Sequence, residues 1–330
     1  MRTRILLFGV GVATSHYTMA QGCSDAGVCT AGPIGQLQLW QDSTADVVDY
    51  RHYAKVQYSY AVGEQSVTVM QMQPELSIGL TERLSAQVKV PYVWASGKLG
   101  DNSGLGDAVI TGAYAFIKKP ERLLAGTLGL RLPTGTTNAR SSQGPNNVIV
   151  PQEVRSYALP MPYQTGLGTL DLLLAVQYRY KRWTGAVAYQ HVLDHGNENQ
   201  FSHAVWYNDP AVLGYFESTM LQRGNDLVGR VQYAYGCGRL ALQPGVLAIY
   251  RLQEDSRLDV TTPLSEMARN RIVIDGSEGL TFNVTADLRY KLAERWAVEA
   301  VFGMPLVVRE VRPDGLTRSL VTGFGLRYRF

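Results

Sequence analysis

The chain has 330 residues, 45% of them hydrophobic, with a formal net charge of +3 and a mean hydropathy of −0.09. Beyond the N-terminus, no apolar run approaches the ~20 residues that a membrane-spanning helix needs, which excludes a helical membrane protein. A spanning β-strand needs only ~9–11 residues with every second one apolar, so this composition still allows a membrane barrel. The small net charge gives no indication of nucleic-acid binding.

Residues 1–20 have the pattern of a secretory signal peptide. Arg2 and Arg4 form a positive region, an apolar stretch follows, and the small-x-small sequence at 18–20 predicts cleavage before Gln21. The alternative is a buried N-terminal strand. Removal of the signal would lower the formal charge of +3 by two.

The segment 21–53 lacks regular alternation and is too short to form a domain of its own. We expect it to act as a plug inside a barrel domain at 54–330 or to lie in the periplasm. Cys23 and Cys29 are close enough in sequence to form a disulfide in an oxidising compartment, which would leave Cys237 unpaired. Whether they pair is open at this stage.

From residue 54 onward, polar and apolar residues alternate in a series of short runs. The stretch 283–290, Asn-Val-Thr-Ala-Asp-Leu-Arg-Tyr, has polar residues at odd positions and apolar residues at even positions. A period of two places one apolar and one polar face on a strand. The predicted strands are 54–63, 67–80, 84–94, 108–117, 123–132, 169–180, 183–193, 226–235, 239–251, 280–292, 296–308 and 318–330.

The connections between these runs alternate between short and long. The short ones recur around an Arg followed at once by Leu or Trp, at Arg83, Arg122, Arg182, Arg239 and Arg295. Short turns at one end and long loops at the other are typical of bacterial outer-membrane barrels. The sequence therefore predicts a transmembrane antiparallel up-and-down β-barrel of about twelve strands, located in the bacterial outer membrane. The long loops are 95–107, 133–168, 194–225, 252–279 and 309–317.

Aromatic residues spaced two apart end many of the runs that enter short turns. Since residues i and i+2 of a strand share a face, these rings would form one belt beside the short turns. Membrane barrels carry such girdles at the lipid–water interface. The pairs are Tyr114/Phe116, Tyr178/Tyr180, Tyr233/Tyr235 and Tyr328/Phe330.

The last run, 320–330, ends the chain on an aromatic residue. Apolar or aromatic residues occupy nearly every second position up to Tyr328 and Phe330. This pattern resembles the C-terminal assembly signal of outer-membrane barrels, so the expected partners are the barrel-assembly machinery and the lipid bilayer. No nucleic-acid partner is expected.

Three glycine-containing motifs carry a family resemblance. They are Ser103–Ile110, Gly129–Gly135 and a fainter copy of the first at Thr165–Asp171. Together they resemble the phenol meta-pathway (MetA-like) outer-membrane transporter family and, more distantly, the long-chain fatty-acid transporters. The resemblance covers residues 75–330. It implies a barrel that admits hydrophobic or aromatic compounds, and it brings no catalytic residues.

If the aromatic face contacts lipid, the polar face of each strand lines the lumen. This set is mostly basic and predicts either an electropositive pore for anions or an interior filled by paired charges. Arg179 and Arg230 are expected near the middle of the barrel. The apolar loop 133–168 is expected to fold inward. The lumen-lining candidates are Lys89, Arg131, Arg179, Arg230, Asp287, Arg289 and Arg327.

The sequence predicts no catalytic residue, cofactor or metal site. His191, His195 and His203 lie near Asp194 and Glu198, but loop histidines at irregular spacing are usually solvated rather than metal ligands. Three functions stay open: a passive channel for small hydrophobic or aromatic compounds, anionic ones included; a structural or surface-exposed barrel; and, as the weakest, a membrane-embedded hydrolase.

Overall fold

The computed structural model describes residues 52–142, 144, 157–259, 270–315 and 318–330. The predicted signal peptide, Cys23 and Cys29 lie outside these residues. Within them, most of the chain is β-strand, and no helix is long and apolar enough to cross a bilayer. The short 3₁₀ turns are Glu64–Ser66 and Met161–Tyr163.

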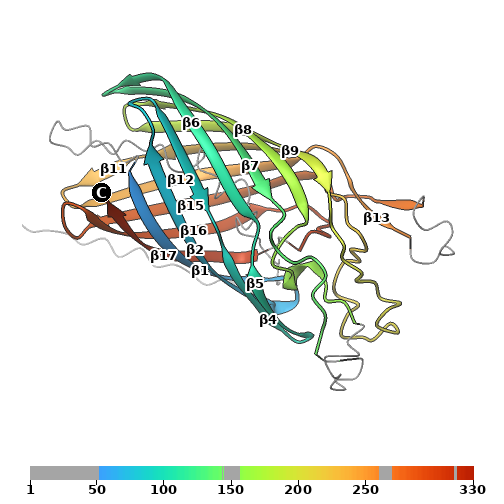
Figure 1. The fold of residues 1–330 in the computed structure, drawn as a ribbon. Helices are drawn as coiled ribbons and strands as arrows, with labels where there is room; N and C mark the ends of the chain where they lie inside the picture. Colours follow the sequence, from blue (N-terminus) through green and yellow to red (C-terminus); the bar gives the residue numbers. More distant parts are fainter. Residues whose placement is uncertain (1–51, 143, 145–156, 260–269, 316–317) are drawn as a thin grey trace, which may run out of the picture.

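Twelve antiparallel strands close into a barrel, as the sequence predicts (Figure 1). β1 pairs with β2 on one side and with β17 on the other, which joins the two ends of the sheet. The barrel strands are β1 Tyr53–Gly63, β2 Thr68–Gly79, β3 Leu84–Lys89, β6 Ala108–Lys119, β7 Arg122–Leu132, β8 Thr169–Tyr180, β9 Trp183–His195, β10 Asp226–Tyr233, β12 Leu240–Arg251, β15 Gly279–Lys291, β16 Trp296–Val307 and β17 Arg318–Arg329, and the short β11 Tyr235–Cys237 extends the pairing with β12.

Consecutive strands are joined by tight turns at one end of the barrel. The turns between β6 and β7 and between β8 and β9 contain only two residues each, 120–121 and 181–182. In Figure 1 the C-terminus lies at this short-turn end, and β4, β5 and β13 lie toward the other end with the long connections. This layout is the one that the loop lengths predict.

Two hairpins occupy segments that the sequence analysis assigned to loops. β4 Tyr92–Gly97 continues β3 after an interruption at Val90–Pro91, keeps its pairing with β2, and forms a hairpin with β5 Gly100–Leu105. Pro91 has no amide hydrogen to donate, which ends the predicted strand early, and the glycine-rich β5 lacks apolar alternation. A second hairpin joins β13 Asp255–Leu258 and β14 Arg271–Ile274.

The outer surface of the barrel is apolar and the inner surface is polar. In β8, for example, Leu174 is 41% exposed, whereas its neighbour Leu173 is 4% exposed. Tyr114 and Phe116 lie on the outer face with their rings 5.2 Å apart, in the predicted aromatic belt. A closed barrel with this outer surface belongs in a bilayer, because the barrel strands pair with neighbours on both sides and apolar side chains face the lipid.

Candidate functional site in the barrel interior

The residues predicted to line the lumen lie on the inward face of their strands. Lys89 is 2% exposed, Arg131 is 1% exposed and Arg327 is 4% exposed, while their neighbours in sequence point outward. Arg230 and Asp287 are half-buried. The interior is therefore where charged side chains from distant parts of the chain meet.

A continuous row of cross-strand partners crosses seven strands of the inner wall. From β8 to β17 the row is Asp171, Arg131, Val109, Lys89, Glu75, Lys55 and Arg327. We call this row the charge ladder. Residues that face each other directly on adjacent strands have the closest side chains in a sheet, so the ladder brings opposite charges into contact.

Glu75 is the acidic centre of the charge ladder. Its carboxylate lies 3.3 Å from Lys55 Nζ and 3.9 Å from Lys89 Nζ. The hydroxyl of Tyr53 donates a hydrogen bond to it, and Gln87 Nε2 donates another at 2.7 Å. Glu75 is 3% exposed, and these partners replace the water that the carboxylate loses on burial.

Glu299 is the second acidic centre, next to the end of the charge ladder. Its carboxylate accepts from Arg289 at 2.6 Å and from Arg327 at 2.8 Å, and Lys55 Nζ lies 3.6 Å away. The guanidinium of Arg327 also covers the ring of Tyr53, 4.0 Å from its centroid. Two glutamates thus share four basic side chains.

Two further ion pairs lie on the remaining wall. Arg131 contacts Asp171 at the start of the ladder, and Gln190 Nε2 donates to the same carboxylate at 2.6 Å. Arg230 Nη2 lies 2.6 Å from Asp287 Oδ2, which also accepts from Gln232. Arg230 therefore has a carboxylate partner inside the barrel.

Arg179 does not lie in the middle of the barrel as expected. It is the penultimate residue of β8, and its Nη2 donates to the backbone oxygen of Pro120 in the neighbouring short turn, at 3.1 Å. This position follows from the bounds of the strand itself, because the predicted strand 169–180 already ends one residue after Arg179.

An apolar patch interrupts the polar interior. Val109 lies between Arg131 and Lys89 in the charge ladder, and Leu247 faces Arg230 across β10 and β12. The patch is therefore bordered by basic side chains on both sides. We call it the inner apolar patch; its buried members are Val109, Leu173, Ala175, Ala188, Val228, Leu247 and Ile249.

A buried ion network holds the long-loop end of the barrel together. Arg251, the last residue of β12, contacts Asp226 at 2.6 Å, Asp255 at 2.5 Å and Asp314 at 3.0 Å. These carboxylates come from β10, β13 and the 308–317 connection, so one guanidinium joins three elements. Arg223 and Arg309 add further contacts to the same aspartates.

The three glycine-containing motifs meet at the same end of the barrel. Asp107 accepts from the amides of Gly135 at 3.1 Å and Leu167 at 2.8 Å. Gly135 and Gly166 touch backbone to backbone, since a Cβ on either would lie within 2.7 Å of the other's Cα. Burial raises the pKa of Asp107 despite these donors and the nearby Arg131. Glycines here allow a close crossing of loops.

The long loops pack against one another in a cap that buries apolar side chains from solvent. Trp206 is 2% exposed and its indole N–H donates to Ala158 O at 2.8 Å, while Tyr163 and Tyr215 join through their hydroxyls at 3.2 Å. The apolar residues at 157–163 are thus buried against the other loops. This packing explains why loop 133–168 contains so many apolar residues. Residues 145–156 of this loop lie outside the part of the chain that the structure describes. The core of this loop cap includes Val67, Val93, Leu99, Leu159, Phe201 and Val212.

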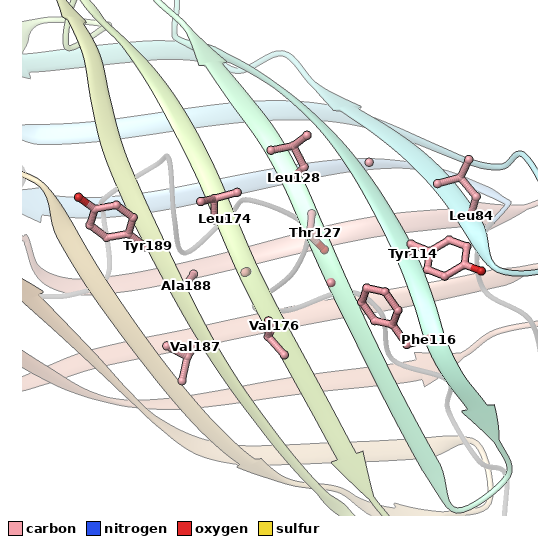
Figure 2. Close-up of a pocket in the computed structure, with 13 residues that line it drawn as sticks. Leu84, Tyr114, Phe116, Thr127, Leu128, Leu174, Val176, Val187, Ala188 and Tyr189 are labelled. Carbon is pink, nitrogen blue, oxygen red and sulfur yellow. The ribbon is translucent and has the colours of Figure 1, made fainter.

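On the outer face, β6 to β9 form a groove of about 720 Å³ lined almost entirely by apolar side chains. Figure 2 shows Tyr114 and Phe116 at one side and Val187 and Tyr189 at the other, with Leu174 and Val176 between them. We call this the outer groove. It faces the bilayer and is separate from the interior site.

The histidines have ordinary hydrogen-bonding partners. His191 Nδ1 lies 3.1 Å from Asn225 Oδ1 and 3.5 Å from the hydroxyl of Tyr189, and His203 Nε2 lies 2.9 Å from Tyr215 O. In the part of the chain that the structure describes, no three His, Cys, Asp or Glu side chains are grouped to hold a metal.

Sequence reasoning predicted Asp287 in the lumen but missed the other acids of the inner wall, Glu75, Asp171 and Glu299. Glu75 could have been found, because Gln71, Gln73, Glu75 and Ser77 alternate with apolar residues along β2. Glu299 has only Ala and Val as its inward neighbours, so it gives no periodic signal.

No model of a known protein family matches the sequence, and no curated protein matches it. Among solved structures, the chain is similar to the crystal structure of an outer membrane channel from Pseudomonas putida F1, with a TM-score of 0.56 and 15% identity over 88% of this chain and all (100%) of that one. It also matches NanC porin (TM-score 0.44, 8% identity, 84% of this chain, 100% of that one) and KdgM porin (TM-score 0.41, 9% identity, 84% and 99%). These likenesses concern the fold, which is that of an outer-membrane β-barrel, and the resemblance to the MetA-like family stays a prediction.

Proposed function

We propose that this barrel is a passive outer-membrane channel for small amphipathic solutes with an apolar body and an anionic head, such as aromatic or fatty carboxylates. The observation that carries this proposal is the inner apolar patch, bordered by Lys89 and Arg131 on one side and by Arg230 on the other. An apolar surface favours the body of such a solute, and neighbouring cations favour its carboxylate.

The balance of charge in the interior supports an anionic preference. Along the described inner wall, bases outnumber carboxylates: Lys55, Lys89, Arg131, Arg179, Arg230, Arg289 and Arg327 face Glu75, Asp171, Asp287 and Glu299. The excess of positive charge is smaller than the sequence pattern indicates, because these four carboxylates offset the charge of four of the bases. The expected field is therefore moderately positive rather than strongly so.

The experiment compares uptake of benzoate with uptake of neutral phenol into vesicles that contain the purified protein. Lys89→Gln is the variant of choice, since it removes one base while Glu75 keeps Lys55 at 3.3 Å. We expect the ratio of benzoate to phenol uptake to fall several-fold. The matched control is Arg239→Gln, which removes one base at an exposed short turn outside the interior and should leave the ratio unchanged.

Two results would count against this function. If Lys89→Gln slows both solutes equally, charge does not select the permeant. If neither solute crosses with the native protein, the barrel is better explained as a structural or surface-exposed protein. The loop cap, which buries Trp206 and Phe201, would then close the barrel to solutes. Release of fatty acid from phospholipid vesicles would instead favour the hydrolase alternative.

A further inference from the structure

Basic residues are concentrated at the short turns next to the outer groove. Lys118 and Lys119 end β6, Arg122 begins β7, and Lys181 and Arg182 form the turn between β8 and β9. All are exposed except Lys118, which is half-buried. These are the short turns of the same four strands, β6 to β9, that line the groove.

Other short turns of the barrel do not share this charge. Counted in the same way, with the strand ends included, the turn after β2 contains Glu82 and Arg83, the turn before β12 contains Arg239, and the turn before β16 contains Lys291, Glu294 and Arg295. Each of these carries a formal charge of zero or +1, whereas the β6–β7 turn, with Glu121 beside its three bases, and the β8–β9 turn each carry +2. The basic residues at the foot of the outer groove are therefore a local feature.

Tyr180 holds two of the cations at the level of the aromatic belt. The guanidinium carbon of Arg122 lies 5.3 Å from the centroid of its ring, and Lys181 Nζ lies 5.4 Å from it. Tyr180 itself is 39% exposed on the outer face. Cation–π contacts of this kind keep the two charges beside the lipid–water interface.

The spacing matches a single amphipathic molecule. Lys119 follows Phe116, at the edge of the groove, by three residues along β6, or about 10 Å at the rise of a β-strand. An acyl chain in the groove would thus place its headgroup at the level of the basic turns. The groove itself offers almost no polar group, which excludes a headgroup there.

We propose that the outer groove and the basic turns of β6 to β9 form a binding site for an anionic glycerophospholipid of the leaflet at the short-turn end. One acyl chain lies in the groove, over Gly112 and Gly126, and the anionic headgroup contacts Lys119, Arg122 and Lys181 (Figure 2 shows the groove). Short turns of this class of barrel face the periplasm, so the lipid belongs to the periplasmic leaflet.

The test measures which lipids stay bound when the protein is released from nanodiscs that contain equal amounts of phosphatidylglycerol and phosphatidylcholine with the same acyl chains. Native mass spectrometry gives the amount of each retained lipid. We expect the native protein to retain phosphatidylglycerol over phosphatidylcholine. Lys119→Gln with Lys181→Gln should abolish this preference, whereas Arg239→Gln with Arg295→Gln, at exposed short turns whose strands do not line the groove, should preserve it.

A second variant tests the groove. No atom lies within 4 Å of a Cβ built on Gly112, so Gly112→Leu fills the groove without a clash and should reduce retention of both lipids. Gly229→Leu on β10 is the matched control, since Gly229 also has open space but lies outside the groove. Heat-dependent gel mobility confirms that each variant is folded.

Three results would overturn the proposal. They are equal retention of the two lipids by the native protein, equal effects of the test and control variants, and a change in the number of copies per complex on Gly112→Leu. The last would identify a second copy of the chain as the occupant. The exposed turn variants test the headgroup contact even if Gly112→Leu does not fold.

Discussion

At the scale of single residues, the interior is organised by a few acids that each serve several bases. Glu299 contacts Arg289, Arg327 and Lys55, and Glu75 contacts Lys55 and Lys89. A buried ion pair adds little net stability, because desolvation offsets the attraction, but removing one partner leaves an unpaired charge that is costly. The acids are therefore the sensitive positions of this network.

Glu299→Gln should destabilise the barrel by about 3–5 kcal/mol, the usual cost of breaking a buried ion pair. The physical reason is that Arg289 and Arg327 lose the carboxylate that they contact at 2.6 Å and 2.8 Å. The free energy of unfolding in urea, with the protein inserted in lipid vesicles, measures the effect. Glu294→Gln, in an exposed turn, should change it by less than about 0.5 kcal/mol, and a similar loss in both variants would contradict the role of the network.

The ion network at the long-loop end should depend on pH for its stability, because it contains the buried carboxyl of Asp314 in the connection before β17. Burial alone would raise its pKa, but the guanidinium groups of Arg309, Arg251 and Arg223 outweigh it and hold the pKa far below its ordinary value. A carboxyl whose pKa is depressed in the folded state stabilises it above the unfolded pKa of about 3.9, and this stabilisation is lost as the pH falls below that value. Asp255 in the same network has its pKa raised by burial and opposes the effect.

We therefore expect amide protection of the β13–β14 hairpin, measured by hydrogen exchange, to decrease as the pH falls from about 4 to about 2. Asp314→Asn should reduce protection at pH 7 and weaken its dependence on pH. Asp275→Asn, at an exposed position of the following turn, is the control. If Asp314→Asn keeps the native profile, the network does not fasten the hairpin.

At the scale of elements, each barrel strand presents a lipid face and a lumen face with a period of two. On β10, Val231 is 46% exposed toward the bilayer, whereas Gln232 is 3% exposed and donates to Asp287. Loops follow other rules: Asp107 and the glycines at 135 and 166 fix a crossing of loop 95–107 with the two ends of loop 133–168. Strand faces can be found from periodicity, and such crossings cannot.

Lysine substitutions at these two adjacent positions should differ greatly in their cost to the free energy of unfolding. Val231→Lys places a charge in the hydrocarbon region and should cost about 2–4 kcal/mol if the position lies near the bilayer midplane. Gln232→Lys places the charge beside the Asp287 carboxylate and should cost much less. Unfolding in lipid vesicles compares them directly, and equal costs would mean that the assigned faces are wrong.

At the scale of the whole molecule, closure depends on the two ends of the chain. β17 pairs with β1 from Tyr53↔Arg329 to Val62↔Leu320, and Tyr328 packs on Trp296 with ring centroids 4.8 Å apart. Phe330 is 54% exposed at the short-turn end. The pairing of β17 with β1 thus closes the barrel.

Replacing Phe330 with Asp should impair insertion while leaving export intact, because the terminal aromatic position becomes charged. The measurement is the amount of protein in outer-membrane and periplasmic fractions, and a loss of about tenfold from the membrane corresponds to roughly 1.4 kcal/mol in a partition equilibrium. Arg329→Gln is the control next to it. Normal membrane levels of Phe330→Asp would contradict an assembly signal at this position.

The sequence by itself determined the number of barrel strands, their boundaries to within a few residues, the lipid-facing and lumen-facing positions, and which end carries the short turns. These follow from a period of two and from turn lengths, which are local properties. The tertiary structure alone decided which charges meet. Arg131 and Asp171 are 40 positions apart, and Glu75 and Glu299 are joined through Lys55 only because β1 closes the barrel between β2 and β17. Strand stagger sets these contacts, and stagger depends on the pairing of every strand with its neighbours.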